Sequence, residues 1–230
     1  MAVTLRVWST HAAMDVLDAL RPRFESDAGV VLDLAYDPGR KIRRDMENGA
    51  TCDVAIVPLP VFEAMAAQGL LIAETRADVG RCGLGVSVRE GAAVPDISTP
   101  EALKRAFLNA KSVVRSTDGT SGHHFETLVE RFGIADEVRG RIVMGPSGRV
   151  AELVARGEAE LAVQQIPELL PVKGTRYVGP YPEELQLYTV FCAGVAASSR
   201  HRAEAERLTA ALVTPDMQKR FAAVGLEPIT

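Results

Sequence analysis

The stretch LRVWSTHAAMDVLDALRPRFE, residues 5–25, decides the fold, because it changes from a strand pattern to a helix pattern. Residues 5–8 form a β-rich run, and a helix is expected from about His11 to Gly29. The apolar residues of this helix recur every three or four positions: Met14, Leu17, Leu20 and Phe24. A second strand is expected at 30–36, and this strand–helix–strand order is typical of an α/β protein.

The same alternation of strands and helices continues along the chain. Pro38 opens a helix that runs to Gly49, at a first-turn position where proline is tolerated. Residues 53–57 are continuously apolar, as expected of a strand buried in a parallel sheet. Further strands are expected at 83–88, 111–116, 141–145, 160–165 and 185–195, and further helices at 60–68, 124–132, 200–213 and 215–224.

The composition bounds the possible classes of protein. The chain has 230 residues, of which 47% are hydrophobic and 24% charged, so it can bury a core in one large domain or two small lobes. Its formal net charge is −4, and only 5% of the residues are aromatic. A nucleic-acid-binding protein would carry a basic excess or aromatic platforms for stacking bases. We therefore expect no nucleic-acid partner.

The sequence indicates no metal or cofactor site, because its cysteines lack ligand spacing and the common cofactor-binding and catalytic motifs are absent. Cys52, Cys82 and Cys192 lie far apart in apolar runs, so they are interpreted as buried thiols. The four histidines do not stand at metal-ligand spacing from them, so no metal is expected. Walker, GxSxG and HExxH motifs are absent, and no GxGxxG follows a strand, so no cofactor is expected.

The N-terminal residues MAVTLRVWS have the pattern of a strand and show no secretory signal. No apolar run approaches the roughly 20 residues of a membrane span, so we expect that the protein is not membrane-embedded. As written, the sequence predicts a cytoplasmic protein. A periplasmic location is expected instead if the sequence is a trimmed mature chain.

Short polar loops follow several of the expected strands and open helices. In open α/β sheets ligands bind at the carboxyl ends of the strands, where helix N-termini offer free N–H groups that suit anions. Ordinary helix-capping chemistry explains any one such loop, but together they favour an anion site. The four loops are Ser9 to His11, Asp37 to Arg40, Ser116 to His123, and Pro146 to Arg149.

Four segments, taken in order, carry a resemblance to a known family. They are LRVWSTHAAMDVLDALRPRFE (5–25), YDPGRKIRRDMENGATCDVAIVP (36–58), GRVAELVARGEAELAVQQ (148–165) and LTAALVTPDMQKRFAAVGLEP (208–228). The chain resembles the type II periplasmic-binding-protein superfamily over nearly its whole length. Within it the chain is similar to the molybdate-binding component of ABC transporters.

The resemblance implies a two-lobed α/β fold. Each lobe would be a mixed, mostly parallel sheet flanked by helices, with the ligand in a cleft between the lobes. The chain would cross twice, so that residues 1–84 and 181–230 form the first lobe and residues 85–180 the second.

The sequence departs from the molybdate-binding pattern where the ligand would bind. The family's first-loop serine falls on Ala12, its hydroxyl pair falls on Gly39 and Arg40, and its tyrosine of the second lobe falls near Gln165. A guanidinium suits a planar carboxylate through bidentate pairing better than it suits a tetrahedral oxyanion. We therefore expect a di- or tricarboxylate in place of molybdate.

The expected ligand-binding residues are Ser9, Thr10, His11, Gly39, Arg40, Ser121, Gly122, His123, Arg149 and Gln165. Each also has a simpler interpretation. The arginines are equally consistent with solvated basic surface, and the histidines with first-turn or capping positions. Asp53, at the start of a strand, is interpreted as a structural hydrogen-bond acceptor.

Three functions remain open at this level. The first is a solute-binding protein that closes on a small organic anion, with an ABC transporter as its partner if it is exported. The second is an isomerase, because the resembling superfamily contains an aconitate isomerase; it would shift a proton in an unsaturated polycarboxylate, with His11 or His123 as the base. The third, a ligand-sensing regulatory module, is disfavoured because no helix-turn-helix accompanies the chain.

Overall fold

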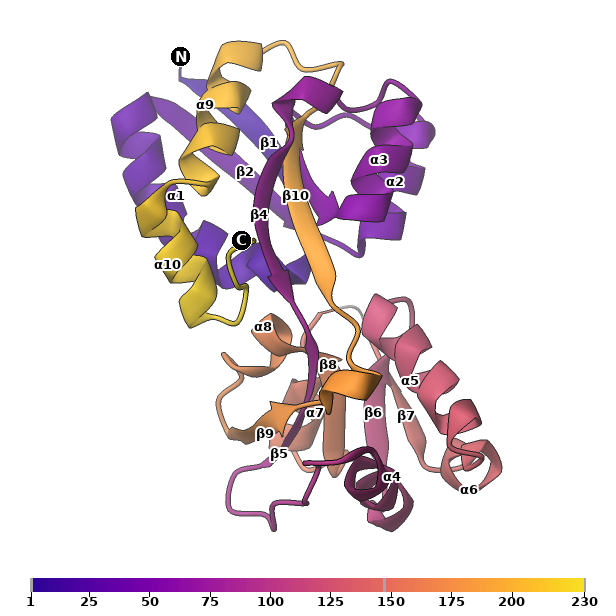
Figure 1. Ribbon diagram of the computed structural model, residues 1–230. Coiled ribbons are helices and arrows are strands. Elements are labelled where there is room, and N and C mark those ends of the chain that lie inside the picture. The colour runs from indigo at the N-terminus through magenta and orange to yellow at the C-terminus, as the bar shows by residue number, and fades with distance from the viewer. Residues whose placement is uncertain (1, 147, 230) are drawn as a thin grey trace. The chain divides into compact units, whose positions relative to one another are not determined.

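The computed structural model describes residues 2–146 and 148–229, which fold into two compact units (Figure 1). Unit 1 runs up to Arg81 and resumes at Thr189, and unit 2 is Cys82–Tyr188. Unit 2 therefore includes 181–188, which the sequence analysis assigned to the first lobe. The reason is that Tyr181 and Leu185 are buried in the core of unit 2.

Unit 1 is built on a five-stranded sheet in the order β2-β1-β3-β10-β4. Strand β1 pairs in parallel with β2 and β3, whereas β10 is antiparallel to β3. The strands are β1 (Val3–Ser9), β2 (Val30–Tyr36), β3 (Val54–Pro58), β4 (Ala77–Cys82) and β10 (Thr189–Val195).

Helices cover both faces of this sheet. Figure 1 shows α1, α9 and α10 on one side of it and α2 and α3 on the other. Gly29 ends α1 in the left-handed conformation, with φ 67°. The helical elements of unit 1 are η1 (His11–Ala13), α1 (Met14–Ala28), α2 (Gly39–Glu47), α3 (Leu59–Ala67), η2 (Ala73–Thr75), α9 (Arg202–Leu212) and α10 (Pro215–Ala223).

Unit 2 has its own five-stranded sheet, in the order β7-β6-β8-β5-β9. Strand β6 is parallel to β7 and β8, and β5 is antiparallel to β8 and β9. The strands are β5 (Leu84–Arg89), β6 (Val113–Ser116), β7 (Ile142–Gly145), β8 (Leu161–Gln165) and β9 (Thr175–Pro180).

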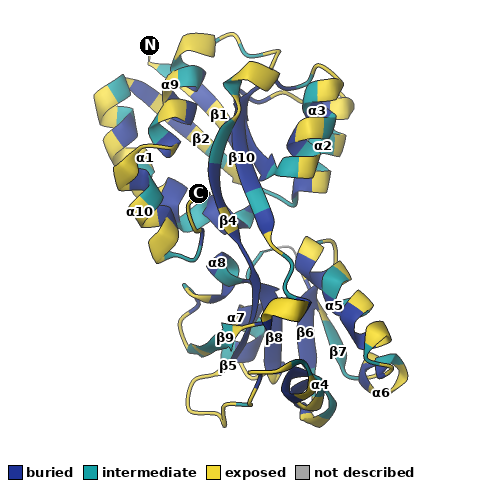
Figure 2. Cartoon of the chain, in the orientation of Figure 1, coloured by how far each residue is buried: buried dark blue, intermediate teal, exposed yellow. Residues whose placement is uncertain are grey.

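Successive side chains of these strands point to opposite faces, and each face has its own helices. Val113 packs in a cluster with residues of α4 and α5, whereas Val114 packs with residues of α7 and α8. Figure 2 shows the buried strands and the helices, whose outer faces are exposed. The helical elements are α4 (Pro100–Asn109), α5 (Thr120–Arg131), α6 (Ala135–Arg139), α7 (Ala151–Ala155), α8 (Ile166–Leu169) and η3 (Glu183–Leu185).

The expected α/β class with two lobes is confirmed, and so is the burial of the three cysteines, which are free. Two strands were missed: β4 and β9 each lie at the edge of a sheet. The strand expected at 185–195 is shorter, because 183–185 form η3 and β10 begins at Thr189. Within the described residues, no helix has the length and apolar character needed to span a membrane.

Candidate functional site

In unit 1, the carboxyl ends of three parallel strands meet at one edge of the sheet, and each strand leads into a helix. The Asp37 amide donates to the Ser9 carbonyl oxygen (3.0 Å), which ties the end of β2 to the end of β1. The Thr10 amide donates to the Ile56 carbonyl oxygen of β3 (3.0 Å). The His11 and Tyr36 rings lie 6.2 Å apart between centroids. The predicted residues of the first loop are therefore packed against the ends of β2 and β3.

Gly39 belongs to the same edge, and its lack of a side chain has a packing reason. A Cβ atom there would lie 2.8 Å from Pro58 Cδ and 3.7 Å from Thr10 Cγ2. The first turn of α2 thus approaches the ends of β1 and β3 more closely than any larger residue would allow. This edge brings together all five residues predicted for the first lobe, Ser9, Thr10, His11, Gly39 and Arg40.

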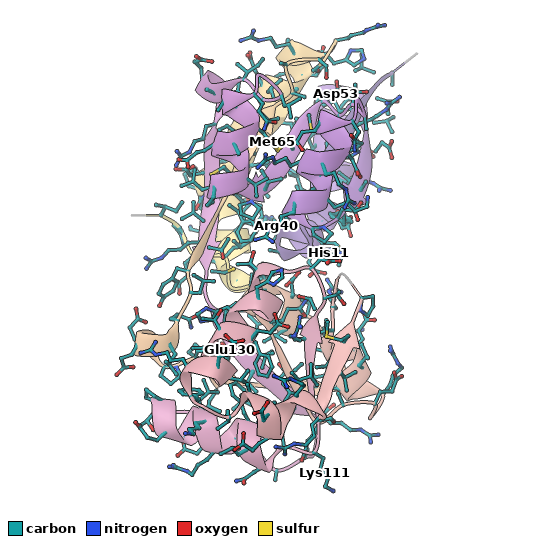
Figure 3. The ribbon with its side chains drawn as sticks, turned by 90° about the vertical axis from the view of Figure 1, so that its right-hand side faces the viewer. His11, Arg40, Asp53, Met65, Lys111 and Glu130 are labelled. Atoms are coloured by element: carbon teal, nitrogen blue, oxygen red, sulfur yellow. The ribbon has the colours of Figure 1, made fainter. Side chains whose placement is uncertain are left out.

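The electrostatics of this edge favour an anion. The first turns of α2 and α3 contain no acidic residue, although Asp37 precedes the N-cap of α2 and pairs with Lys41. Arg40 is exposed in the first turn of α2, where a cation works against the helix dipole and is not explained by helix stability. In the stick view of Figure 3, His11 and Arg40 lie at the same end of unit 1, and Asp53 lies at the opposite end.

Lys41, the residue after Arg40, is paired with two carboxylates close to it in the sequence. Lys41 Nζ lies 2.8 Å from both Asp37 Oδ2 and Asp45 Oδ2. The hydrogen bond to Asp37 and then that to Asp45 raise the pKa of Lys41. Within the basic run RKIRR (40–44), Lys41 and Arg43 are therefore paired with carboxylates on the helix surface, whereas Arg40 lies at the strand edge.

Unit 2 repeats this arrangement at the carboxyl ends of β6, β7 and β8. Gly122 lies in the first turn of α5, and a Cβ there would clash with the Ser116 carbonyl oxygen and lie 3.1 Å from Arg115 Nη1. The N-terminus of α5 is thus packed directly on the end of β6. Of the other predicted residues, Ser121 is buried beside Gly122, and Gln165 is the last residue of β8. Ser147, in the predicted 146–149 loop, lies outside the described residues.

A buried arginine stands behind this first turn. Arg115 is only 5% exposed. Its Nη1 donates to the Ser116 carbonyl oxygen (2.9 Å), and its Nη2 donates to Glu126. The other Glu126 oxygen lies 3.8 Å from His123 Nδ1. This ion pair joins a buried arginine to a glutamate whose side chain is 44% exposed, and through that glutamate it links the strand end to an exposed histidine.

The adjacent histidines have different roles. His124 Nε2 is hydrogen-bonded to the Leu185 carbonyl oxygen (2.8 Å), so its ring joins α5 to η3. His123 is exposed on α5 and faces Glu126. The structure therefore leaves His123, not His124, available for chemistry at the surface of unit 2.

Buried hydroxyl groups mark both edges. Thr10 Oγ1 in unit 1 and Ser116 Oγ in unit 2 are buried without a hydrogen-bond partner among the described residues. Thr10 directly follows β1, and Ser116 is the last residue of β6. Ser87 Oγ, within β5, and Arg115 Nε are also buried without a partner in the described part of the chain. Of the three hydroxyls, those of Thr10 and Ser116 lie at strand ends, the edge at which open α/β sheets bind ligands.

Sequence reasoning missed two residues next to the 146–149 loop. Gln164, buried in β8, accepts a hydrogen bond from the Val150 amide (3.1 Å) and donates to the Gly148 carbonyl oxygen. Burial raises the pKa of Glu168 to about 8, although a hydrogen bond from Gln164 and the charge of Arg149 oppose the shift. The sequence held one signal for Glu168: it is a carboxylate in the first turn of the helix that follows β8. A negative charge at that place would disfavour the binding of an anion.

Asp53 has a structural role, as the sequence suggested. Its Oδ2 accepts from the Arg6 amide (2.8 Å), and its Oδ1 accepts from Ser199 Oγ (2.6 Å). It is buried at the start of β3, away from the strand ends that carry His11 and Arg40 (Figure 3).

Comparisons with known proteins agree with this architecture. A protein named aconitate isomerase, from Pseudomonas sp., is 29% identical over 231 residues, which cover 98% of this chain and 88% of that protein. The molybdate-binding periplasmic protein of Azotobacter vinelandii has a TM-score of 0.82 at 18% identity, covering 98% of this chain and 100% of that one. A sulfate-binding protein of Mycobacterium tuberculosis has a TM-score of 0.78 at 14% identity, covering 99% and 87%.

These structural neighbours share the fold with this chain at identities below 20%. The family model described as bacterial extracellular solute-binding protein matches residues 5–227. Because this match spans nearly the whole sequence, the chain belongs to the bacterial extracellular solute-binding protein family.

Proposed function

We propose that this solute-binding protein takes a small organic anion with two or three carboxylates as its ligand. The observation that carries the proposal is Arg40, exposed in a first turn without acidic residues. Its neighbour Gly39 packs against Thr10, whose buried hydroxyl has no hydrogen-bond partner in the described part of the chain. A planar guanidinium pairs with a carboxylate through two parallel hydrogen bonds, which a tetrahedral oxyanion matches less well. The relative named aconitate isomerase supports a polycarboxylate as the ligand. For an exported protein, the partner would be an ABC transporter.

The ligand class is tested by calorimetry and thermal shift with trans-aconitate, cis-aconitate, citrate, molybdate and sulfate. We expect a carboxylate to bind and to raise Tm, because a ligand that binds only the folded state stabilises it. Micromolar binding corresponds to about −8 kcal/mol, which a few charge-assisted hydrogen bonds and helix N-termini can supply. Binding of molybdate or sulfate, with none of the carboxylates bound, would refute the proposal.

Arg40→Gln is expected to weaken carboxylate binding by about tenfold to 150-fold. A hydrogen bond to a charged group contributes about 1.5–3 kcal/mol, and each 1.4 kcal/mol is a factor of ten. Arg43→Gln is the matched control, because Arg43 lies on the same helix and pairs with Glu47 at 2.8 Å. Equal loss of affinity in both variants, measured by calorimetry, would show that Arg40 contributes only general positive charge.

A second candidate function is a carboxylate isomerase, which the 29% identity to the aconitate isomerase favours. A base would remove a proton from the methylene carbon, the double bond would shift, and a proton would return to the former vinylic carbon. No oxidant or cofactor is consumed. His123 is the base that the geometry supports best, because the Glu126 carboxylate 3.8 Å away can orient its ring.

The two functions are separated by proton NMR of trans- and cis-aconitate with the protein in D2O. An isomerase converts one isomer into the other and incorporates deuterium at carbon, whereas a binding protein does neither. If the protein is an isomerase, His123→Gln should slow the reaction by about 10²- to 10⁴-fold, the usual contribution of a general base. His11→Gln is the comparison variant, since His11 lies in unit 1 beside Tyr36. Tight binding with neither conversion of the isomers nor exchange would eliminate the isomerase.

A further inference from the structure

Three side chains of unit 2 form a chain of contacts from the end of β6 to the surface of α5. Arg115 Nη1 donates to the Ser116 carbonyl oxygen (2.9 Å), and Arg115 Nη2 donates to Glu126 Oε1. The other carboxylate oxygen, Glu126 Oε2, lies 3.8 Å from His123 Nδ1. The two oxygens of Glu126 therefore have different partners, a buried guanidinium and an exposed imidazole.

The buried arginine fixes the direction in which the Glu126 carboxylate faces. The Glu126 side chain is 44% exposed, and such a glutamate on a helix surface samples several rotamers when nothing holds it. Arg115 is a rigid planar donor that is already anchored to the main chain, and its hydrogen bond to a carboxylate is charge-assisted. Oε1 is therefore held on Arg115, and Oε2 is left facing His123.

The position of Glu126 Oε2 decides which ring nitrogen of a neutral His123 carries the proton. An ionised carboxylate only accepts hydrogen bonds, so it favours the proton on the nitrogen that faces it, Nδ1. The second nitrogen, Nε2, then keeps a lone pair that can accept a proton. The separation of 3.8 Å is long for a hydrogen bond, but the contact between a base and its orienting carboxylate often tightens only when substrate binds.

The neighbouring polar groups of α5 are engaged elsewhere. His124 Nε2 is hydrogen-bonded to the Leu185 carbonyl oxygen, and Thr127 Oγ1 donates to the main-chain carbonyl oxygen of His123. In the described part of unit 2, Glu126 is thus the carboxylate that lies against the His123 ring.

We propose that Glu126, held by Arg115, is a positioning residue that keeps the proton of neutral His123 on Nδ1 and leaves Nε2 as the base. The catalytic part of this inference rests on the isomerase proposed above, whereas the tautomer of His123 does not. In the reaction, Nε2 takes a proton from the methylene carbon, and the electron pair of that C–H bond forms the new double bond. The electron pair of the old double bond moves to the former vinylic carbon, which receives the proton back from Nε2.

The tautomer is measured by long-range proton–nitrogen NMR of the protein labelled with nitrogen-15 histidine, because protonated and unprotonated ring nitrogens differ in chemical shift. Spectra are recorded at about pH 8.5, where imidazoles are neutral. His123→Gln identifies the signals of His123 among those of the four histidines. For the wild type we expect the Nδ1–H tautomer, and a wild-type His123 with its proton on Nε2 would overturn the proposal.

Glu126→Gln should reverse the tautomer. Arg115 Nη2 needs an acceptor, so it holds the carboxamide oxygen and turns the NH2 group toward His123 Nδ1. A donor at that place favours an unprotonated Nδ1 and moves the proton to Nε2. Glu130→Gln is the matched control, because it removes the same charge one turn further along α5 at an exposed position (Figure 3). It should leave the Nδ1–H tautomer in place.

A purely structural Arg115–Glu126 pair would give a different result. Glu126→Gln would then lower Tm, because the buried guanidinium loses its counter-ion, but the tautomer of His123 would stay as in the wild type. That combination would overturn the positioning role. The wild-type spectrum tests the proposal even if Glu126→Gln does not fold.

Turnover of trans- and cis-aconitate tests the catalytic part. Glu126→Gln should lower kcat by about tenfold to a hundredfold with little change in KM, because the working tautomer loses a charge-assisted hydrogen bond. Glu130→Gln should match the wild type. If the tautomers behave as expected and the wild type isomerises neither substrate, the isomerase fails and the positioning of His123 stands. If the wild type isomerises aconitate and Glu126→Gln keeps its kcat, the positioning role is overturned and the isomerase stands.

Discussion

Phe107→Ala is expected to destabilise unit 2 by about 3–5 kcal/mol, the cost of removing a fully buried aromatic side chain and leaving a cavity. Phe107 is 0% exposed, its ring packs edge-on against Phe125 with centroids 5.1 Å apart, and Tyr181 lies 6.3 Å away. All three residues belong to one core cluster on a single face of the unit 2 sheet. Large-to-small changes at such sites are costly because the surrounding structure relaxes only in part.

Urea denaturation followed by two probes measures this effect. Far-ultraviolet circular dichroism reports on both units, whereas fluorescence of Trp8, the single tryptophan, reports on unit 1. We expect Phe107→Ala to lower the midpoint seen by circular dichroism more than the midpoint seen by fluorescence. Leu170→Ala, at a residue that is 41% exposed, is the control and should change stability by less than about 0.5 kcal/mol. A loss below about 1 kcal/mol for Phe107→Ala would contradict the packing described here.

Gly122→Ala is expected to cost about 1–3 kcal/mol of stability, the usual range for overpacking, and to weaken carboxylate binding as well. The added Cβ would clash with the Ser116 carbonyl oxygen and approach Arg115 Nη1 to 3.1 Å. A carbonyl of β6 cannot move aside without moving its strand, so the first turn of α5 must shift. Ser121 and His123 lie in that turn and shift with it.

Gly140→Ala is the matched control in the same unit. Gly140 has helical dihedral angles (φ −71°, ψ −4°), and no heavy atom lies within 4 Å of its Cβ position. Alanine there should be neutral or stabilise by up to about 1 kcal/mol, through the unfolded chain. Chemical denaturation and calorimetry with trans-aconitate check both variants. Unchanged stability and affinity for Gly122→Ala would show that the α5 N-terminus is not packed on β6 as described.

The strands and helices that position the site were largely predictable, because their patterns are local. The run expected at 30–36 coincides with β2, and the strand ends expected to carry polar loops are the ends of β1, β2, β6 and β7. The two missed strands lie at sheet edges, and β4 (ADVGRC) is not an apolar run. It forms beside β10, more than a hundred residues later in the chain, so no local pattern announces it.

The composition of the site was less predictable than its location. Arg40 and Arg149 could be proposed as ligand-binding residues because they lie in loops after strands. Their contact with a ligand is still a prediction. The burial of Arg115 depends on Glu126, one helix later, and the raised pKa of Glu168 depends on how deeply α8 packs. Both depend on groups from separate elements that become neighbours only in the folded unit.

The sequence by itself determined the order of strands and helices, the α/β class and the polar loops, because hydrophobic periodicity and turn residues act over short stretches of chain. The two lobes were expected from the family resemblance. The tertiary structure decided which of those loop residues are buried and which hydrogen bonds they make. It buries the Thr10 and Ser116 hydroxyls without partners, and it brackets Arg149 with Gln164. Hydrogen bonding and desolvation depend on which atoms meet, and parallel strands bring together atoms that are far apart in the sequence.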